Sequence, residues 1–159
     1  MKPRVVVTGI GAVTPIGTGR QSLWQSLLAG TSGFAPVASF DTKAFPVHLG
    51  AEVRGFAAEE YVRTLSPERL GRASQLGIAA AYLALADAGL EPQALDRERS
   101  GVAMGTTSGE PREVERFDDR YMAGELDRVG AEFMSLYPCH MIAVHIAREL
   151  GLEGVNTML

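Results

Sequence analysis

Apolar residues along the chain fall into short β-branched runs and longer stripes with helical spacing. Val5, Val6 and Val7 form a run with no polar residue, so we predict a strand that is buried on both faces. Residues 101–105 form a second short apolar run, and residues 155–159 begin like a third strand. Glycine-rich or small polar segments follow the first two runs, which predicts loops at the strand ends.

Two helices are predicted with clear start and stop signals. Residues 20–29 carry an apolar face and end before Gly30, which suits a left-handed stop. The second helix is predicted from Ser66 to about residue 88, because Ser-Pro-Glu supplies a cap, a proline for the first turn and an acid that complements the helix dipole. Its apolar positions keep helical spacing, and Gly89 is expected to end it.

A third helix is predicted for residues 139–150, ending at Gly151. Residues 31–56 show no helical period, so we predict extended and partly exposed chain there. Residues 110–132 contain eight acidic residues and four arginines among few apolar ones, which predicts a solvated helical excursion with a surface role. Strands that alternate with helices indicate an α/β protein with a largely parallel sheet, in which loops at strand ends carry function.

Composition is typical of a soluble globular protein that forms one domain. The chain has 159 residues, of which 46% are hydrophobic and 21% are charged. The net charge is −4 and no stripe of lysine and arginine is present, which argues against nucleic-acid binding. Cys139 is the only cysteine, so neither an internal disulfide framework nor a multi-cysteine metal site is expected.

Neither a membrane span nor a signal peptide is predicted. The longest apolar run, residues 76–86, is shorter than the roughly 20 residues that a membrane-spanning helix requires. The apolar stretch near the N-terminus is too short for a signal peptide. We therefore expect a cytoplasmic protein.

The glycine-rich loop after residue 8 has only a superficial likeness to a dinucleotide-binding fingerprint. Gly9 and Gly11 would need a glycine or alanine at position 14, where Thr14 stands, and Pro15 would interrupt the helix that holds the phosphate. No acidic residue lies near position 30 to bind a ribose. No Gly-Lys-Ser/Thr occurs either, which excludes a P-loop.

Residues 4–17, Arg-Val-Val-Val-Thr-Gly-Ile-Gly-Ala-Val-Thr-Pro-Ile-Gly, instead closely resemble the opening of the elongating type II β-ketoacyl-(acyl carrier protein) synthases of the thiolase superfamily. Further segments resemble that family in the same order: residues 23–24, 27–33, 40–42, 45–46, 52–56 and 84–90. Residues 101–105 resemble the strand before the acyl pocket, and residues 141–154 resemble the helix and turn before the nucleophile strand. An ordered series of segments is more specific than one motif.

The resemblance implies an α/β, thiolase-like layered fold with a mixed, mainly parallel sheet and packed helices. Residues 1–159 would form the N-terminal half of it, as a β-ketoacyl synthase N-terminal domain that stops before the nucleophile cysteine. The last strand leads into no following turn, which also leads us to expect a truncated sequence. The complete protein would be a homodimer that needs no cofactor and no metal.

The resemblance also implies a reaction and its partners. The family moves an acyl group onto a cysteine, decarboxylates a malonyl group on acyl carrier protein and condenses the two, in fatty acid or polyketide synthesis. Its partners are acyl carrier protein and acyl and malonyl thioesters. The cysteine is expected shortly after Leu159, and the supporting histidines and lysine belong to the second half, so no catalytic residue is expected in this chain and the fragment alone is predicted to be inactive.

A second interpretation of the function stays open. The chain could belong to a non-condensing homologue, such as a chain-length-factor-like subunit or a malonyl decarboxylase, in which glutamine or serine replaces the cysteine. The acyl chain length and the choice between fatty acid and polyketide synthesis stay open as well.

Three residues fall where the family places the acyl pocket. Cys139 aligns with a residue that lines the pocket, Ser108 with a position that is commonly bulky and apolar, and His140 with an expected asparagine. Glu110-Pro111 replaces what is often a second glycine. These departures suggest either an unusual acyl specificity, polyketide-like or for a polar chain, or a pocket that has simply repacked.

Cys139 itself is not expected to be a nucleophile. Adjacent helical residues point about 100° apart, and His145 would lie about 120° round the helix from Cys139, so neither His140 nor His145 is placed to activate the thiol. An inert core or pocket-wall cysteine is the simpler interpretation.

Arg69 and Arg72, near the start of the second predicted helix, could contact the acidic acyl carrier protein. A solvated helix face explains them equally well.

Overall fold

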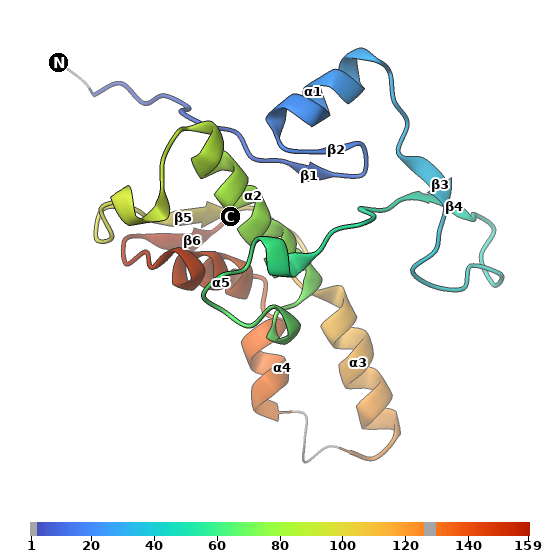
Figure 1. The fold of residues 1–159 in the computed structure, drawn as a ribbon. Coiled ribbons are helices and arrows are strands. Elements are labelled where there is room, and N and C mark those ends of the chain that lie inside the picture. Colours follow the sequence, from blue (N-terminus) through green and yellow to red (C-terminus); the bar gives the residue numbers. More distant parts are fainter. Residues whose placement is uncertain (1–2, 126–129) are drawn as a thin grey trace.

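Two helices form the centre of the molecule, α2 (Arg72–Asp87) and α5 (His140–Leu150) (Figure 1). The computed structural model describes residues 3–125 and 130–159. Ile78 and Ile142 are almost fully buried where the two helices meet, and Ile146 packs beside them. Gly77 allows this approach, because a Cβ there would lie 3.2 Å from the Ile146 side chain. The alanine- and glycine-rich sequence of α2 thus serves close helix packing.

The strands β5 (Val102–Met104) and β6 (Asn156–Met158) form a parallel pair in which Val102 faces Asn156. Both predicted strands at these positions are confirmed. Helix α5 contacts α2 and both strands of this pair, so it connects the helical core to the parallel sheet (Figure 1).

The other strand pairs are antiparallel. Strand β1 (Val13–Thr14) pairs with β2 (Gly17–Thr18), and β3 (Phe34–Pro36) pairs with β4 (Leu49–Ala51). The prediction of extended chain in residues 31–56 is confirmed. The architecture is mixed helix and sheet, but within residues 3–125 and 130–159 only the β5–β6 pair is parallel.

The prediction of a buried strand at Val5, Val6 and Val7 is wrong for this chain. The segment is not a strand, and Val5 is 96% exposed. A strand needs a neighbouring backbone to satisfy its N–H and C=O groups, and no strand of the described part of the chain pairs with this segment.

The glycine-rich loop that follows lies against the C-terminal half of α2. A Cβ on Gly9 or Gly11 would collide with the α2 backbone, at the carbonyls of Ala84 and Ala80. The Ile10 N–H also donates to the Asp87 carboxylate at 3.0 Å. The glycines therefore allow the chain to pack closely on a helix.

Helix α1 (Arg20–Leu28) is confirmed, with Gly30 at φ 63° after its end. An ion pair of 2.6 Å between Arg20 and Asp87 joins its start to the end of α2. Its predicted apolar face is not covered, since Trp24 is 58% exposed and Leu28 70% exposed.

The long helix begins later than predicted. Residues 67–69 form a short 3-10 turn, η2 (Pro67–Arg69), and α2 starts only at Arg72. Ser66 makes no side-chain capping bond, so the Ser-Pro-Glu signal starts the turn and not the helix. The predicted stop is confirmed, because Gly89 adopts φ 68°.

Helices α3 (Pro111–Met122) and α4 (Gly130–Leu136) form an arm that extends away from the core (Figure 1). Phe117 of α3 and Phe133 of α4 hold the two together, with ring centroids 4.6 Å apart. The predicted helix in residues 110–132 is confirmed over residues 111–122, while residues 126–129 lie outside the described residues. The prediction of a solvated surface is wrong for Glu110 and Glu113, which are buried.

Two short 3-10 turns complete the chain, η1 (Ala58–Glu60) and η3 (Pro92–Ala94). In the part of the chain that the structure describes, no helix is both long and apolar enough to cross a membrane.

Candidate functional site

The loop of residues 106–109, between β5 and α3, runs against the start of α5. Gly109 has φ 63°, and a Cβ there would lie 2.8 Å from the Tyr137 carbonyl and 3.0 Å from the Cys139 Cα. The structure therefore brings the segment that contains Ser108 next to Cys139, two of the residues predicted to line a pocket. Ser108 and the adjoining His140 are exposed, and Cys139 is half-buried.

Cys139 lies at the N-cap of α5, without a side-chain capping bond. Among the described contacts its thiol makes no hydrogen bond. The Nδ1 atom of His145 lies 2.9 Å from the Ser74 hydroxyl, so this histidine is engaged with α2. Burial lowers the pKa of His145 below its usual value of 6.5. These contacts agree with the expectation that His145 does not activate Cys139.

Glu110 is buried, although from the sequence it was noted only as a departure from the family pattern and a solvated surface was predicted there. Its side chain is 1% exposed and accepts hydrogen bonds from the backbone N–H groups of Ala73 at 2.9 Å and Ser74 at 2.7 Å. Because these are free N–H groups of the first turn of α2, Glu110 caps that helix from a distant part of the chain. A carboxylate is also favoured there by the helix dipole.

Gly71 completes this arrangement. A Cβ at this position would collide with the Glu110 carboxyl group. The glycine before α2 therefore leaves the space that the buried carboxylate occupies. No local sequence signal links the two residues, since the hydrogen bonds span 36 and 37 positions.

A second buried glutamate, Glu149 of α5, holds the chain before η2. Its carboxylate accepts bonds from the N–H groups of Arg63, Thr64 and Leu65, at 2.6, 3.0 and 2.8 Å. The Tyr82 hydroxyl donates to it at 3.0 Å, and burial together with this carboxylate raises the pKa of Tyr82 to about 12. Glu149 is therefore fully occupied in positioning the scaffold.

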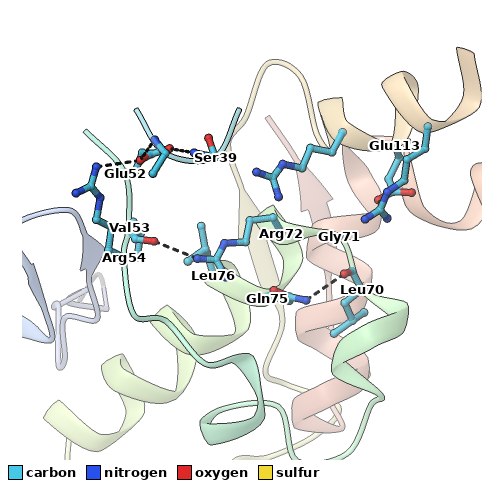
Figure 2. Close-up of a pocket in the computed structure, with 13 residues that line it drawn as sticks. Ser39, Glu52, Val53, Arg54, Leu70, Gly71, Arg72, Gln75, Leu76 and Glu113 are labelled. Atoms are coloured by element: carbon cyan, nitrogen blue, oxygen red, sulfur yellow. Dashed lines mark hydrogen bonds and ion pairs between the residues drawn. The ribbon is translucent and has the colours of Figure 1, made fainter. Parts of the chain in front are cut away.

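An open cleft of about 680 Å³ lies between α2, α3 and the β4 segment (Figure 2). Four arginines and two glutamates are among its lining residues: Arg54, Arg72, Arg112, Arg116, Glu52 and Glu113. The Arg72 guanidinium donates to the Val53 carbonyl at 3.3 Å and lies 4.6 Å from the centre of the Phe56 ring. Arg116 pairs with Glu113 at 2.7 Å.

Arg69 lines a smaller adjoining depression of about 100 Å³, which shares Leu70, Glu113 and Arg116 with the cleft. The two arginines predicted to bind a carrier protein therefore lie on neighbouring hollows of one basic surface. Their environments differ, because Arg72 is held by Val53 and Phe56, whereas no side-chain bond of Arg69 occurs within the described residues. Sequence reasoning missed Arg112 and Arg116, which helix α3 brings to the same surface.

The described residues contain no group of three or more histidine, cysteine, aspartate or glutamate side chains that could hold a metal ion.

Comparison of the sequence with protein families gives a match over residues 2–159 to the model described as "Beta-ketoacyl synthase, N-terminal domain". The 3-oxoacyl-(acyl-carrier-protein) synthase 2 of Vibrio cholerae is 35% identical over 155 residues. That match covers 98% of this chain and 37% of the relative. The chain thus spans little more than a third of this curated relative.

The fold is similar to that of solved ketosynthase structures. The ishigamide ketosynthase/chain length factor superposes with a TM-score of 0.87 at 30% identity, covering 97% of this chain and 39% of the other. A type II polyketide acyl-carrier protein in complex with its ketosynthase, AntDE:AntF, gives a TM-score of 0.76 at 18% identity, which shows the fold alone.

Proposed function

Because the chain belongs to the β-ketoacyl synthase N-terminal domain family, we propose that it is part of a condensing enzyme. The enzyme extends an acyl chain by decarboxylative Claisen condensation with malonyl-(acyl carrier protein), in fatty acid or polyketide synthesis. The observation that carries this proposal is the family match over residues 2–159, together with 35% identity over 155 residues to the 3-oxoacyl-(acyl-carrier-protein) synthase 2 of Vibrio cholerae.

The proposed reaction has three steps. A cysteine thiolate attacks the acyl thioester and releases the carrier thiol, since the thiolate is the reactive form. The malonyl thioester then loses carbon dioxide to give an enolate, which attacks the enzyme-bound acyl group and releases the cysteine. Hydrogen-bond donors stabilise the negative charge that develops on oxygen.

The nucleophile is proposed to follow β6 shortly after Leu159, and therefore outside this sequence. The role of residues 1–159 is then to supply scaffold, pocket wall and partner surface. The test is a condensation assay on the full-length protein.

We further propose that this protein acts in the cytoplasm as a homodimer.

The acyl pocket is proposed to include Ser108, Cys139 and His140. The adjacency of the Ser108 loop to the start of α5 supports this proposal. Because Ser108 and His140 are exposed in this chain, the pocket would need further protein to close it. The polar side chains favour a specificity other than that of an all-apolar pocket.

Acyl carrier protein is the proposed partner of the basic surface around Arg69 and Arg72. The clustering of these residues with Arg112 and Arg116 supports the proposal, since an acidic protein would be steered by such a surface.

A non-condensing homologue is a second candidate. One observation favours it, because one of the similar solved structures is a ketosynthase/chain length factor. The coding sequence just beyond Leu159 discriminates between the two candidates: a cysteine supports condensation, and glutamine or serine supports the non-condensing homologue.

A further inference from the structure

Glu110 directly follows the loop of the proposed pocket, yet its charged side chain is buried. Its carboxylate is buried, and each of its oxygens accepts one backbone N–H of α2, from Ala73 and Ser74. Burial of an unpaired charge would be costly, so these two bonds and the positive end of the helix hold the side chain in place. Glu110 therefore attaches the loop to the start of α2.

The residue before it attaches the same loop to α5. Gly109 lies so close to Tyr137 and Cys139 that any side chain would collide with their backbone. Two consecutive residues, Gly109 and Glu110, thus contact the starts of two different helices. Ser108 directly precedes them, so its position depends on both contacts.

A hydrogen bond between the two helices continues this arrangement. Ser74, one of the N–H donors to Glu110, places its hydroxyl 2.9 Å from Nδ1 of His145 in α5. Both side chains are buried. The first turn of α2, the Ser108 loop and α5 are therefore connected through one set of buried polar contacts.

The same turn of α2 lies beside the basic surface. Arg72 is its first residue, and Arg69 is in the 3-10 turn just before it. A change in the position of this turn would therefore move both proposed carrier-protein contacts, and Glu110 would transmit the change to the Ser108 loop.

We propose that Glu110 is a positioning residue that fixes the Ser108 loop against α2 and α5 and so sets acyl-chain selectivity without touching the substrate. The proposal rests on the proposed function of the chain. It goes beyond helix capping, because a cap alone would stabilise α2 and leave selectivity unchanged.

The test compares Glu110→Gln with wild type in the full-length protein. Glutamine keeps the size of the side chain, but its NH₂ group cannot accept a hydrogen bond. One of the two backbone N–H groups that Glu110 binds therefore loses its acceptor. We expect the ratio of kcat/KM for long and short acyl thioesters to change by about fivefold. Hydrogen exchange should become faster at the amides of Ala73 and Ser74 and in residues 106–109.

Glu115→Gln is the matched control, because Glu115 is an exposed residue of the same helix α3. It should change neither selectivity nor exchange. Gly71→Ala provides a second route, since its methyl group displaces the Glu110 carboxylate without removing the charge. It should shift both readouts in the same direction as Glu110→Gln.

Faster exchange at residues 73 and 74 with an unchanged selectivity ratio would show that Glu110 is only a cap and would overturn the proposal. If the full-length protein condenses no substrate, the proposed function fails, but hydrogen exchange still tests whether Glu110 fixes the Ser108 loop. In that case, exchange of residues 106–109 in Glu110→Gln at the wild-type rate overturns the proposal.

Discussion

At the scale of single residues, two buried glutamates bind backbone segments and hold them in place. Glu110 accepts two backbone N–H groups at the start of α2, and Glu149 accepts three from residues 63–65. Each carboxylate thereby joins segments that are far apart in the sequence. Such bonds are strong because the acceptor is charged and shielded from water.

His145 gives a prediction at this scale. Burial lowers its pKa below 6.5, the nearby Glu110 charge opposes that shift and Arg148 adds to it. In the unfolded chain His145 takes up a proton near pH 6.5, whereas in the folded protein its imidazole stays neutral at that pH. The free energy of unfolding should therefore fall as the pH drops below 6.5.

An NMR titration of the imidazole in the full-length protein checks this prediction, with His145→Gln to assign the resonance. We expect a midpoint below 6.5, and a midpoint at or above 6.5 would contradict the buried environment.

The local turn signals could be read from the sequence, but the buried partners could not. Gly30, Gly89 and Gly151 were expected to end helices and all adopt positive φ. A glycine stop depends on its immediate neighbours, whereas the role of Glu110 depends on residues 36 and 37 positions away. Its acidic surroundings in the sequence indicated a surface residue instead.

At the scale of elements, one half-buried glutamate, Glu52, connects the two segments of the β3–β4 region. Glu52 accepts the N–H groups of Ala38 and Ser39 at 2.9 and 3.0 Å and pairs with Arg54 at 3.2 Å. Hydrogen bonds from Ser39 and Ala38 lower the pKa of Glu52 to about 2. The carboxylate therefore joins the segments that follow the two paired strands.

Glu52→Ala should release this contact. We expect faster hydrogen exchange at the amides of Ala38 and Ser39, because both lose their acceptor. Since the pKa is depressed from 4.5, the wild-type contact contributes stability above pH 4.5 and is lost as the pH falls towards about 2. Exchange rates equal to wild type at neutral pH would show that the contact does not form.

The existence of helix α2 was predicted correctly, but its first residue was not. Its apolar spacing predicted a central helix correctly, because packing against α5 follows the helical period. Its start was misplaced because Ser66 satisfies a cap motif in sequence but begins only a 3-10 turn. Tertiary contacts from Glu110 decide where the helix proper begins.

At the scale of the whole molecule, much apolar surface is uncovered. The exposed area of the 17.0 kDa chain is 11033 Å², whereas a compact monomer of that mass exposes about 7,700 Å². Large apolar side chains gather in residues 5–10, on α1 and around β3–β4. The sequence predicted a buried strand at residues 5–7 and an apolar face on α1, whereas residues 31–56 were predicted to be partly exposed. No element of the described part of the chain covers the exposed apolar side chains of residues 5–10 and α1.

The basic surface supports a prediction about partner binding. If the carrier protein binds here as proposed, Arg69→Glu in the full-length protein should raise the KM for carrier-protein substrates by about tenfold. It should leave small thioester substrates unaffected, because they would not contact this surface. Arg69 is chosen over Arg72, which also holds Val53 and Phe56.

Arg99→Glu is the matched control, since Arg99 is an exposed arginine in the segment before β5 and its reversal changes the net charge equally. An equal KM effect from both variants would refute a specific carrier-protein contact at Arg69.

The central claim is that this chain belongs to an enzyme that joins carbon chains. The most direct measurement is mass spectrometry of the full-length protein's products after incubation with an acyl thioester and malonyl-(acyl carrier protein). We predict a 3-oxoacyl product on the carrier protein together with released carbon dioxide. Decarboxylation of the malonyl group without a new carbon–carbon bond would contradict the proposed condensing function and support the non-condensing homologue.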